Sequence, residues 1–134
     1  MNIVITEWAL DSYLELKGMG AFSEEEYRHI IRQDVLLLKD GLPLKNPKFR
    51  NNKFWGPAQD IRGKEIPCGF KMKWHNMGNG KNEIRLSIAI IEESAYLCHA
   101  YLKTSDTQDK RFSSRLKNRI ADIHANIFVV RGRL

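Results

Sequence analysis

The sequence lacks the features of a membrane-spanning or secreted protein. No stretch approaches the run of about 18 apolar residues that a membrane-spanning helix needs. The first residues, Met1 to Glu7, have neither a basic start nor a long apolar run, so they do not look like a secretory signal. We therefore expect a cytoplasmic protein with no membrane partner.

Cysteine is scarce. The chain has two, Cys68 and Cys98, and they do not form a Cys-x-x-Cys pair. In a reducing compartment such residues usually behave as small buried hydrophobic side chains, and the spacing gives no support for a disulfide. A zinc site that combined them with a histidine has no favourable spacing either. We expect two buried thiols and no metal ligands.

Motifs of metal-dependent and nucleotide-dependent enzymes are also missing. The chain has no H-E-x-x-H zinc motif, no P-loop and no cluster of aspartates that would hold Mg²⁺. The histidines are too scattered to be read as one ligand set: His29, His75, His99 and His124. We expect no cofactor, so any catalysis would depend on side chains of the chain itself.

What the sequence does have is an uneven positive charge. With 134 residues and 43% hydrophobic residues, residues 1–134 fit one domain with a packed core. The net charge is +6, but residues 1–40 hold 8 acidic and 4 basic residues, whereas residues 41–91 hold 3 acidic and 10 basic residues. The excess of basic residues at 41–91 indicates that one face of the protein binds an anionic partner. The alternative is a basic protein with solvated lysines.

Periodicity and capping residues predict an α+β fold, with an N-terminal strand and two helices packed on an antiparallel meander and a C-terminal amphipathic helix. Thr6 can cap the first helix, and Ser23 with Glu26 forms a capping box for the second. Short turns between three alternating segments predict the meander. We expect strands at 2–6, near 58–62 and at 68–75, 83–91 and 95–103, and helices at 7–17, 24–40 and 112–127. The tail, 128–134, is open between a strand, an arm and a disordered end.

The long connection at residues 41–67 mixes cations with aromatic residues. In its middle, residues 45–55 read Lys-Asn-Pro-Lys-Phe-Arg-Asn-Asn-Lys-Phe-Trp. Charge combined with stacking surfaces is typical of contacts with single-stranded nucleic acid. Phe54 and Trp55 can equally anchor the connection to the core, and this second interpretation is the one we favour.

The three meander strands have two unlike faces, because side chains alternate across a strand. The apolar sets are Cys68, Phe70, Met72 and Trp74, then Ile84, Leu86, Ile88 and Ile90, then Tyr96, Cys98, Ala100 and Leu102. The polar sets are Lys71, Lys73 and His75, then Arg85 and Ser87, then His99, Tyr101 and Lys103. We expect the first two helices to cover the apolar face, which leaves a cationic sheet surface.

The polar face combines groups that suit phosphoryl transfer. Cations stabilise the charge that develops on phosphate oxygens, and a His, Tyr or Lys of shifted pKa can move protons. An RNA substrate supplies its own 2′-hydroxyl as nucleophile, so neither a metal nor a protein nucleophile is required. The alternative is an ordinary hydrated sheet face.

Two stretches of the sequence resemble segments of a known protein family. Residues 82–90, Asn-Glu-Ile-Arg-Leu-Ser-Ile-Ala-Ile, look like an arginine-bearing strand, and residues 95–105, Ala-Tyr-Leu-Cys-His-Ala-Tyr-Leu-Lys-Thr-Ser, are similar to a "LLHAFxKKS" segment. Residues 54–62 are similar in part to a "LWELR" segment. With the order of elements, the chain resembles the RelE/HigB/ParE superfamily of toxins from bacterial type II toxin–antitoxin systems.

The resemblance implies a RelE-like fold and a metal-independent endoribonuclease that cuts mRNA on the ribosome, inhibits translation and is restrained by a cognate antitoxin protein. It also implies that Arg62 and Arg85 grip the scissile phosphate, with His99, Tyr101 and Lys103 at the edge of the site. Further cations would contact the RNA: Lys53, Lys71, Lys73, His75, Arg111 and Arg115. Other family members poison gyrase, and a non-catalytic RNA-binding module is a third possibility.

The chain departs from the family in two respects. Leu102-Lys103-Thr104 offers one lysine where the family usually has two, and no catalytic Tyr or His follows the last helix. The general base therefore remains open, and Lys71, Lys73 or His75 can have taken over this role.

Overall fold

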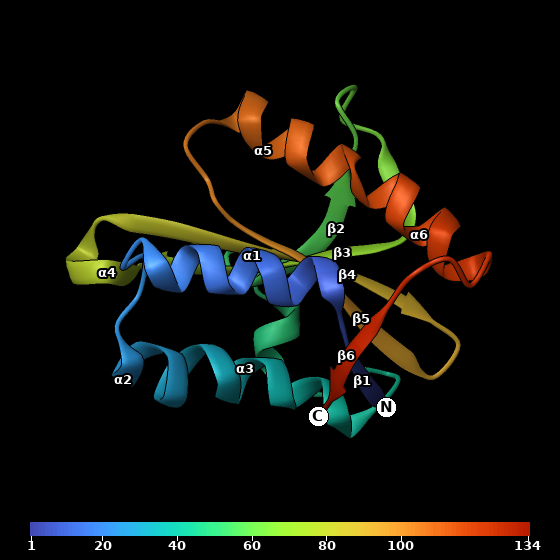
Figure 1. Cartoon of the computed structure of the whole chain (residues 1–134), viewed down its shortest axis with the longest axis horizontal. Helices are drawn as coiled ribbons and strands as arrows, with labels where there is room; N and C mark the ends of the chain where they lie inside the picture. Colours follow the sequence, from blue (N-terminus) through green and yellow to red (C-terminus); the bar gives the residue numbers. More distant parts are fainter.

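A six-stranded sheet forms the middle of the molecule, with helices on both faces (Figure 1). The computed structural model describes all residues, 1–134. The strands follow the order β2-β3-β4-β5-β1-β6 across the sheet. Their bounds are β1 (Asn2–Thr6), β2 (Trp55–Gln59), β3 (Glu65–Asn76), β4 (Asn82–Ile91), β5 (Ser94–Leu102) and β6 (Val130–Arg133).

The predicted meander is confirmed, and the strands outside it complete the sheet. β3, β4 and β5 pair antiparallel in chain order, and β2 adds antiparallel to β3. β1 lies parallel to β5, with Ile3 opposite Ala95. The tail that the sequence left open forms β6, which runs antiparallel to β1. An ion pair of 2.6 Å between Arg131 and Glu7 helps to hold it there.

Two helical segments cover one face of the sheet, as predicted. α1 (Glu7–Gly18) begins at Thr6, whose hydroxyl accepts a hydrogen bond from the amide of Ala9. The second segment begins with the predicted capping box at Ser23 and comprises α2 (Glu24–Glu26), a π-helical turn at Tyr27–Ile31, α3 (Arg32–Leu36) and a 3₁₀ turn at Leu37–Asp40. These helices and the sheet enclose the larger hydrophobic core, of 18 buried residues.

The C-terminal helices cover the opposite face (Figure 1). They are α5 (Asp106–Ser114) and α6 (Leu116–His124), which meet at Arg115. A second core of 6 buried residues lies beneath them: Ala58, Ile66, Ala89, Cys98, Leu116 and Ile123. Both faces of the sheet are therefore covered, and no helix of the structure is long and apolar enough to cross a membrane.

A β-bulge in β5 changes the predicted faces. The register between β4 and β5 shifts between Ser87 and Ile88, so that Ile88 lies opposite Leu97 and Cys98 has no partner in β4. Leu97 consequently joins the larger core, whereas Cys98 belongs to the second core and Tyr96 packs against it. The prediction that Tyr96 and Cys98 share a face with Ala100 and Leu102 was wrong, because strict alternation fails at a bulge.

The two cysteines have different environments. Cys98 is buried, as expected, and burial raises the pKa of its thiol to about 12. Cys68 is exposed, so the prediction of a buried thiol was wrong at this position. The cause is local: Cys68 has a positive φ of 68°, which interrupts the alternation of β3.

The aromatic residues of the long connection serve as anchors. Phe54 and Trp55 are buried in the larger core, and Phe49 packs against both rings edge-on. Lys48 lies over the ring of Phe54, with 5.1 Å between its nitrogen and the ring centroid, and pairs with Asp34. The anchor interpretation is therefore confirmed for Phe54 and Trp55.

Candidate functional site

The predicted polar side chains do gather on one face of β3, β4 and β5. In the sheet register, Lys73 lies opposite Arg85, which lies opposite Tyr101. The next row on the same face is formed by Lys71, Ser87 and His99. We call these six residues the polar cluster.

Four of the six residues of the polar cluster are buried beneath α5, whereas Lys73 and His99 are partly exposed. Lys71, Arg85 and Tyr101 are 7%, 4% and 3% exposed. The expectation of an open cationic sheet surface is therefore corrected, because the C-terminal helices pack on the face that alternation marked as polar. An ordinary hydrated sheet face is excluded for the same reason.

Asp109 of α5 supplies a negative charge to the polar cluster. Its carboxylate accepts a hydrogen bond of 3.0 Å from Lys71 Nζ and one of 2.5 Å from the hydroxyl of Tyr101. Ser113, one helical turn further along α5, lies 3.3 Å from the same hydroxyl. Burial acts to raise the pKa of Asp109, but the bonds from Tyr101 and Lys71 outweigh it and hold that pKa below its usual range. Asp109 is thus ionised at neutral pH.

Three buried polar atoms in the polar cluster have no hydrogen-bond partner: Arg85 Nε, Ser87 Oγ and His99 Nδ1. Unpaired polar atoms are costly inside a protein, and a native structure usually satisfies them with water or a bound group. Ser87 lies directly opposite His99, and Arg85 is the next residue of β4 on the same face. These neighbouring positions can bind a group that both donates and accepts hydrogen bonds.

The ring of His99 is held as a neutral base. Burial, together with the nearby charges of Arg115 and Arg119, lowers the pKa of His99 to about 4. The ring stacks on Tyr101, with 5.3 Å between ring centroids, and meets Phe112 edge-on. At neutral pH this imidazole is unprotonated and is a weaker base than that of an exposed histidine.

The polar cluster has a partly exposed rim at Lys73 and His75, toward the turn between β3 and β4. Lys73 Nζ donates to the carbonyl of Asn52 at 2.8 Å, and burial together with Lys71 and Arg85 lowers the pKa of Lys73. His75 lies 2.6 Å from the carboxylate of Glu83, which itself lies 3.9 Å from Arg85.

The remaining predicted residues lie at or beyond this rim. Lys103 pairs with Asp106 at 2.9 Å, and its side chain is 26% exposed. The backbone carbonyl of Lys53 lies 2.5 Å from His75 Nε2, while the residue itself is exposed. Arg62 is exposed in the turn between β2 and β3, and Lys73 lies toward the opposite end of β3. The structure therefore does not bring Arg62 into the polar cluster.

Arg111 and Arg115 lie on the helical layer that covers the polar cluster. Both are exposed, and the guanidinium of Arg115 stacks over Phe112 at 4.5 Å from the ring centroid. Arg115 is near the polar cluster, because Phe112 also packs against His99 and Tyr101 and the charge of Arg115 acts on His99.

Sequence reasoning missed Asp109, Ser113 and Glu83. The sequence holds a signal for the first two. Asp109 and Ser113 lie three residues before Phe112 and Leu116, so they share the helix side that carries the apolar stripe. A polar residue on the apolar side of a helix indicates a buried polar partner. For Glu83 the signal is alternation, because it lies two residues before Arg85 and so on the same face of β4.

The structure contains no group of three or more His, Cys, Asp or Glu residues that could hold a metal ion. The cluster chemistry is that of cations, a neutral imidazole and hydroxyls. No family model, no curated protein and no solved structure matches this chain.

Proposed function

We propose that this protein is a RelE-like toxin of a bacterial type II toxin–antitoxin system, which cuts mRNA in the cytoplasm, on the ribosome, without a metal ion. The observation that supports the proposal best is the polar cluster, where two lysines and an arginine lie beside a neutral imidazole. Three unpaired polar atoms at adjoining positions add a place for a phosphate group. A cognate antitoxin would hold the protein inactive.

The proposed reaction is an internal transfer at phosphorus. The 2′-oxygen of the ribose attacks the adjacent phosphate, and His99 accepts the hydroxyl proton. The bond to the 5′-oxygen of the next nucleotide breaks, and that oxygen takes a proton from Lys73, whose lowered pKa makes it a better acid. Arg85 and Lys71 stabilise the charge on the phosphate oxygens. The products are a 2′,3′-cyclic phosphate and a 5′-hydroxyl.

RNA must also gain access to the polar cluster. Because Arg85 and Tyr101 are buried under α5, an RNA phosphate reaches them only when this helix moves. The Asp109 carboxylate already accepts hydrogen bonds from Lys71 and Tyr101, so it occupies the position that a substrate anion needs. Substrate binding would therefore exchange an internal anion for an external one.

Induced expression in a bacterium tests the proposal, with growth followed and RNA 5′ ends mapped before and after induction. The wild-type protein should arrest growth and create new internal mRNA ends. Arg85→Met should abolish the new ends, whereas Lys39→Met, which removes an exposed cation on the other side of the sheet, should keep them. Because Arg85 is buried, a melting curve of each purified variant must show that it folds, and His99→Gln serves as a second variant.

Other outcomes would favour the alternatives. Growth arrest with a DNA-damage response and without new RNA ends would indicate a gyrase poison. Harmless expression combined with salt-dependent RNA binding would indicate a non-catalytic RNA-binding module. Cleavage that persists in a folded Arg85→Met protein would contradict the site assignment.

A further inference from the structure

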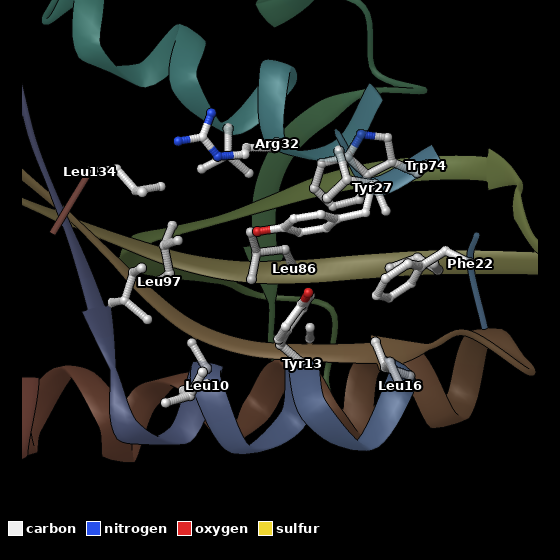
Figure 2. Close-up of a pocket in the computed structure, with 16 residues that line it drawn as sticks. Leu10, Tyr13, Leu16, Phe22, Tyr27, Arg32, Trp74, Leu86, Leu97 and Leu134 are labelled. Carbon is white, nitrogen blue, oxygen red and sulfur yellow. The ribbon is translucent and has the colours of Figure 1, made fainter. Parts of the chain in front are cut away.

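An apolar cavity lies on the other face of the sheet, away from the polar cluster (Figure 2). Its volume is about 160 Å³, and it is bounded by α1, by the helical segment of residues 24–36 and by strands β3, β4 and β5. Of its 16 lining residues 15 are hydrophobic, and the single charged one is Arg32. Small-molecule sites commonly combine a mostly apolar lining with a few polar groups.

Arg32 is a free cation at the edge of this cavity. Its side chain is exposed, so the cavity reaches the protein surface there, and its guanidinium takes part in no ion pair or hydrogen bond within the protein. Arg28, one turn earlier on the same helical segment, differs because it pairs with Glu24 at 3.6 Å. An anion that enters the cavity would therefore meet an available guanidinium.

Two tyrosines contribute polar groups between the helices. Tyr13 projects from α1 and Tyr27 from the facing segment, with 5.0 Å between their ring centroids. Figure 2 shows both hydroxyl oxygens in the space between these helices. Tyrosine hydroxyls are protonated at neutral pH and can donate hydrogen bonds, and burial raises the pKa of these two further.

We propose that this cavity binds a small organic acid, with one carboxylate on an apolar body of about the size of a benzene ring. A cavity of about 150 Å³ lined by apolar side chains accommodates benzene, and this cavity is of similar size. The carboxylate would pair with Arg32 and the apolar body would fill the space over Leu86 and Leu97. The inference does not depend on the proposed ribonuclease activity.

Calorimetric titration with two probes of nearly equal shape tests the charge requirement. These probes are 3-phenylpropionate and its uncharged amide. The wild-type protein should bind the acid about tenfold more tightly than the amide, because a charge-assisted hydrogen bond is stronger than a neutral one. Arg32→Gln should abolish this preference. Arg28→Gln, which removes the same charge from a residue outside the cavity lining, should retain it.

A substitution that fills the cavity tests whether the acid binds there. Ala9 lines the cavity from α1, and Ala9→Leu should weaken binding of both probes at least about tenfold while the protein stays folded in a thermal melt. Tryptophan fluorescence, to which the cavity-lining Trp74 contributes, should respond to the acid in the wild-type protein and respond less in Ala9→Leu. Equal binding of acid and amide, a preference that survives Arg32→Gln, or no binding of either probe would overturn the proposal.

Discussion

His99 shows how burial determines the chemistry of a single residue. An exposed histidine titrates near 6.5, but the pKa of His99 is about 4 because burial and two neighbouring arginines disfavour its charged form. The unfolded chain therefore binds a proton at pH values between about 4 and 6.5 that the folded protein does not bind. The stability that His99 contributes is complete above pH 6.5 and decreases as the pH falls toward about 4.

Replacing a buried and an exposed histidine by glutamine tests this pH dependence. His99→Gln should make the free energy of unfolding less dependent on pH between 4 and 6.5, because a titrating group with a depressed pKa is removed. His29→Gln, on an exposed position, should follow the wild-type curve. Urea denaturation at a series of pH values measures both. A wild-type slope in His99→Gln would show that His99 is not held neutral.

The buried ion pair between Lys71 and Asp109 should matter for stability, because each side chain neutralises the other. The side chains are 9% and 11% exposed, so Asp109→Asn leaves a buried lysine without its counter-charge. We expect a loss of about 3 kcal/mol in unfolding free energy, and a smaller loss for the double variant Lys71→Met/Asp109→Leu, which removes both charges. Asp106→Asn, at an exposed ion pair, should change stability little. Additive losses in the double variant would contradict this account.

At the scale of elements, hydrogen bonds connect the turn between β3 and β4 to α2 and to the loop that precedes it. Gly78 donates its amide to Glu26 at 3.1 Å, and the side-chain amide of Asn82 donates to the carbonyl of Ala21 at 2.9 Å. Gly78 has a positive φ of 57°, and an added Cβ would lie 2.6 Å from the Ala21 oxygen. Only glycine therefore fits this close approach.

A matched pair of alanine substitutions tests this connection. Gly78→Ala and Gly80→Ala both place alanine at a positive φ, which costs about 1 kcal/mol in each case. An added Cβ at Gly80 meets nothing within 4 Å, so Gly78→Ala should cost about 1–3 kcal/mol more. Chemical denaturation gives the difference. Equal losses would mean that the Ala21 contact yields without cost.

Most elements could be predicted from the sequence, but the C-terminal helix was expected as one helix from residue 112, whereas α5 begins at Asp106 and α6 follows separately. Capping residues and periodicity identified the helices after Thr6 and Ser23 and the three meander strands. Alternation also placed Lys71, Arg85 and Tyr101 on one face. It could not show that α5 covers this face, because alternation describes a strand and not its neighbours in space. The bulge at Cys98 was also missed, since one extra residue carries no composition signal of its own.

At the scale of the whole molecule, the two hydrophobic cores differ in size. The core beneath α1 and α3 has 18 buried residues, whereas the one beneath α5 and α6 has 6. Burial of apolar surface is the main source of stability, so the C-terminal helices should be the more weakly held layer. The polar cluster adjoins this weaker layer.

Native-state hydrogen exchange tests this difference. We expect amides of α5 and α6 to exchange through a local opening of lower free energy than amides of β4 and β5, whose exchange should require global unfolding. Asp109→Asn should lower the opening free energy of α5 further, while β4 and β5 follow the change in global stability. Equal protection across α5, α6 and the central strands would show that the helices do not open separately.

The position of β1 has a consequence for synthesis of the chain. β1 occupies residues 2–6, but its sheet neighbours are β5, at residues 94–102, and β6, at residues 130–133. Because β1 is synthesised well before both of its partners, it cannot pair until β5 has left the ribosome, and such non-local pairing slows folding. Until then its row of β-branched side chains is exposed, which makes this nascent stage the most vulnerable to aggregation and the most suitable for chaperone binding.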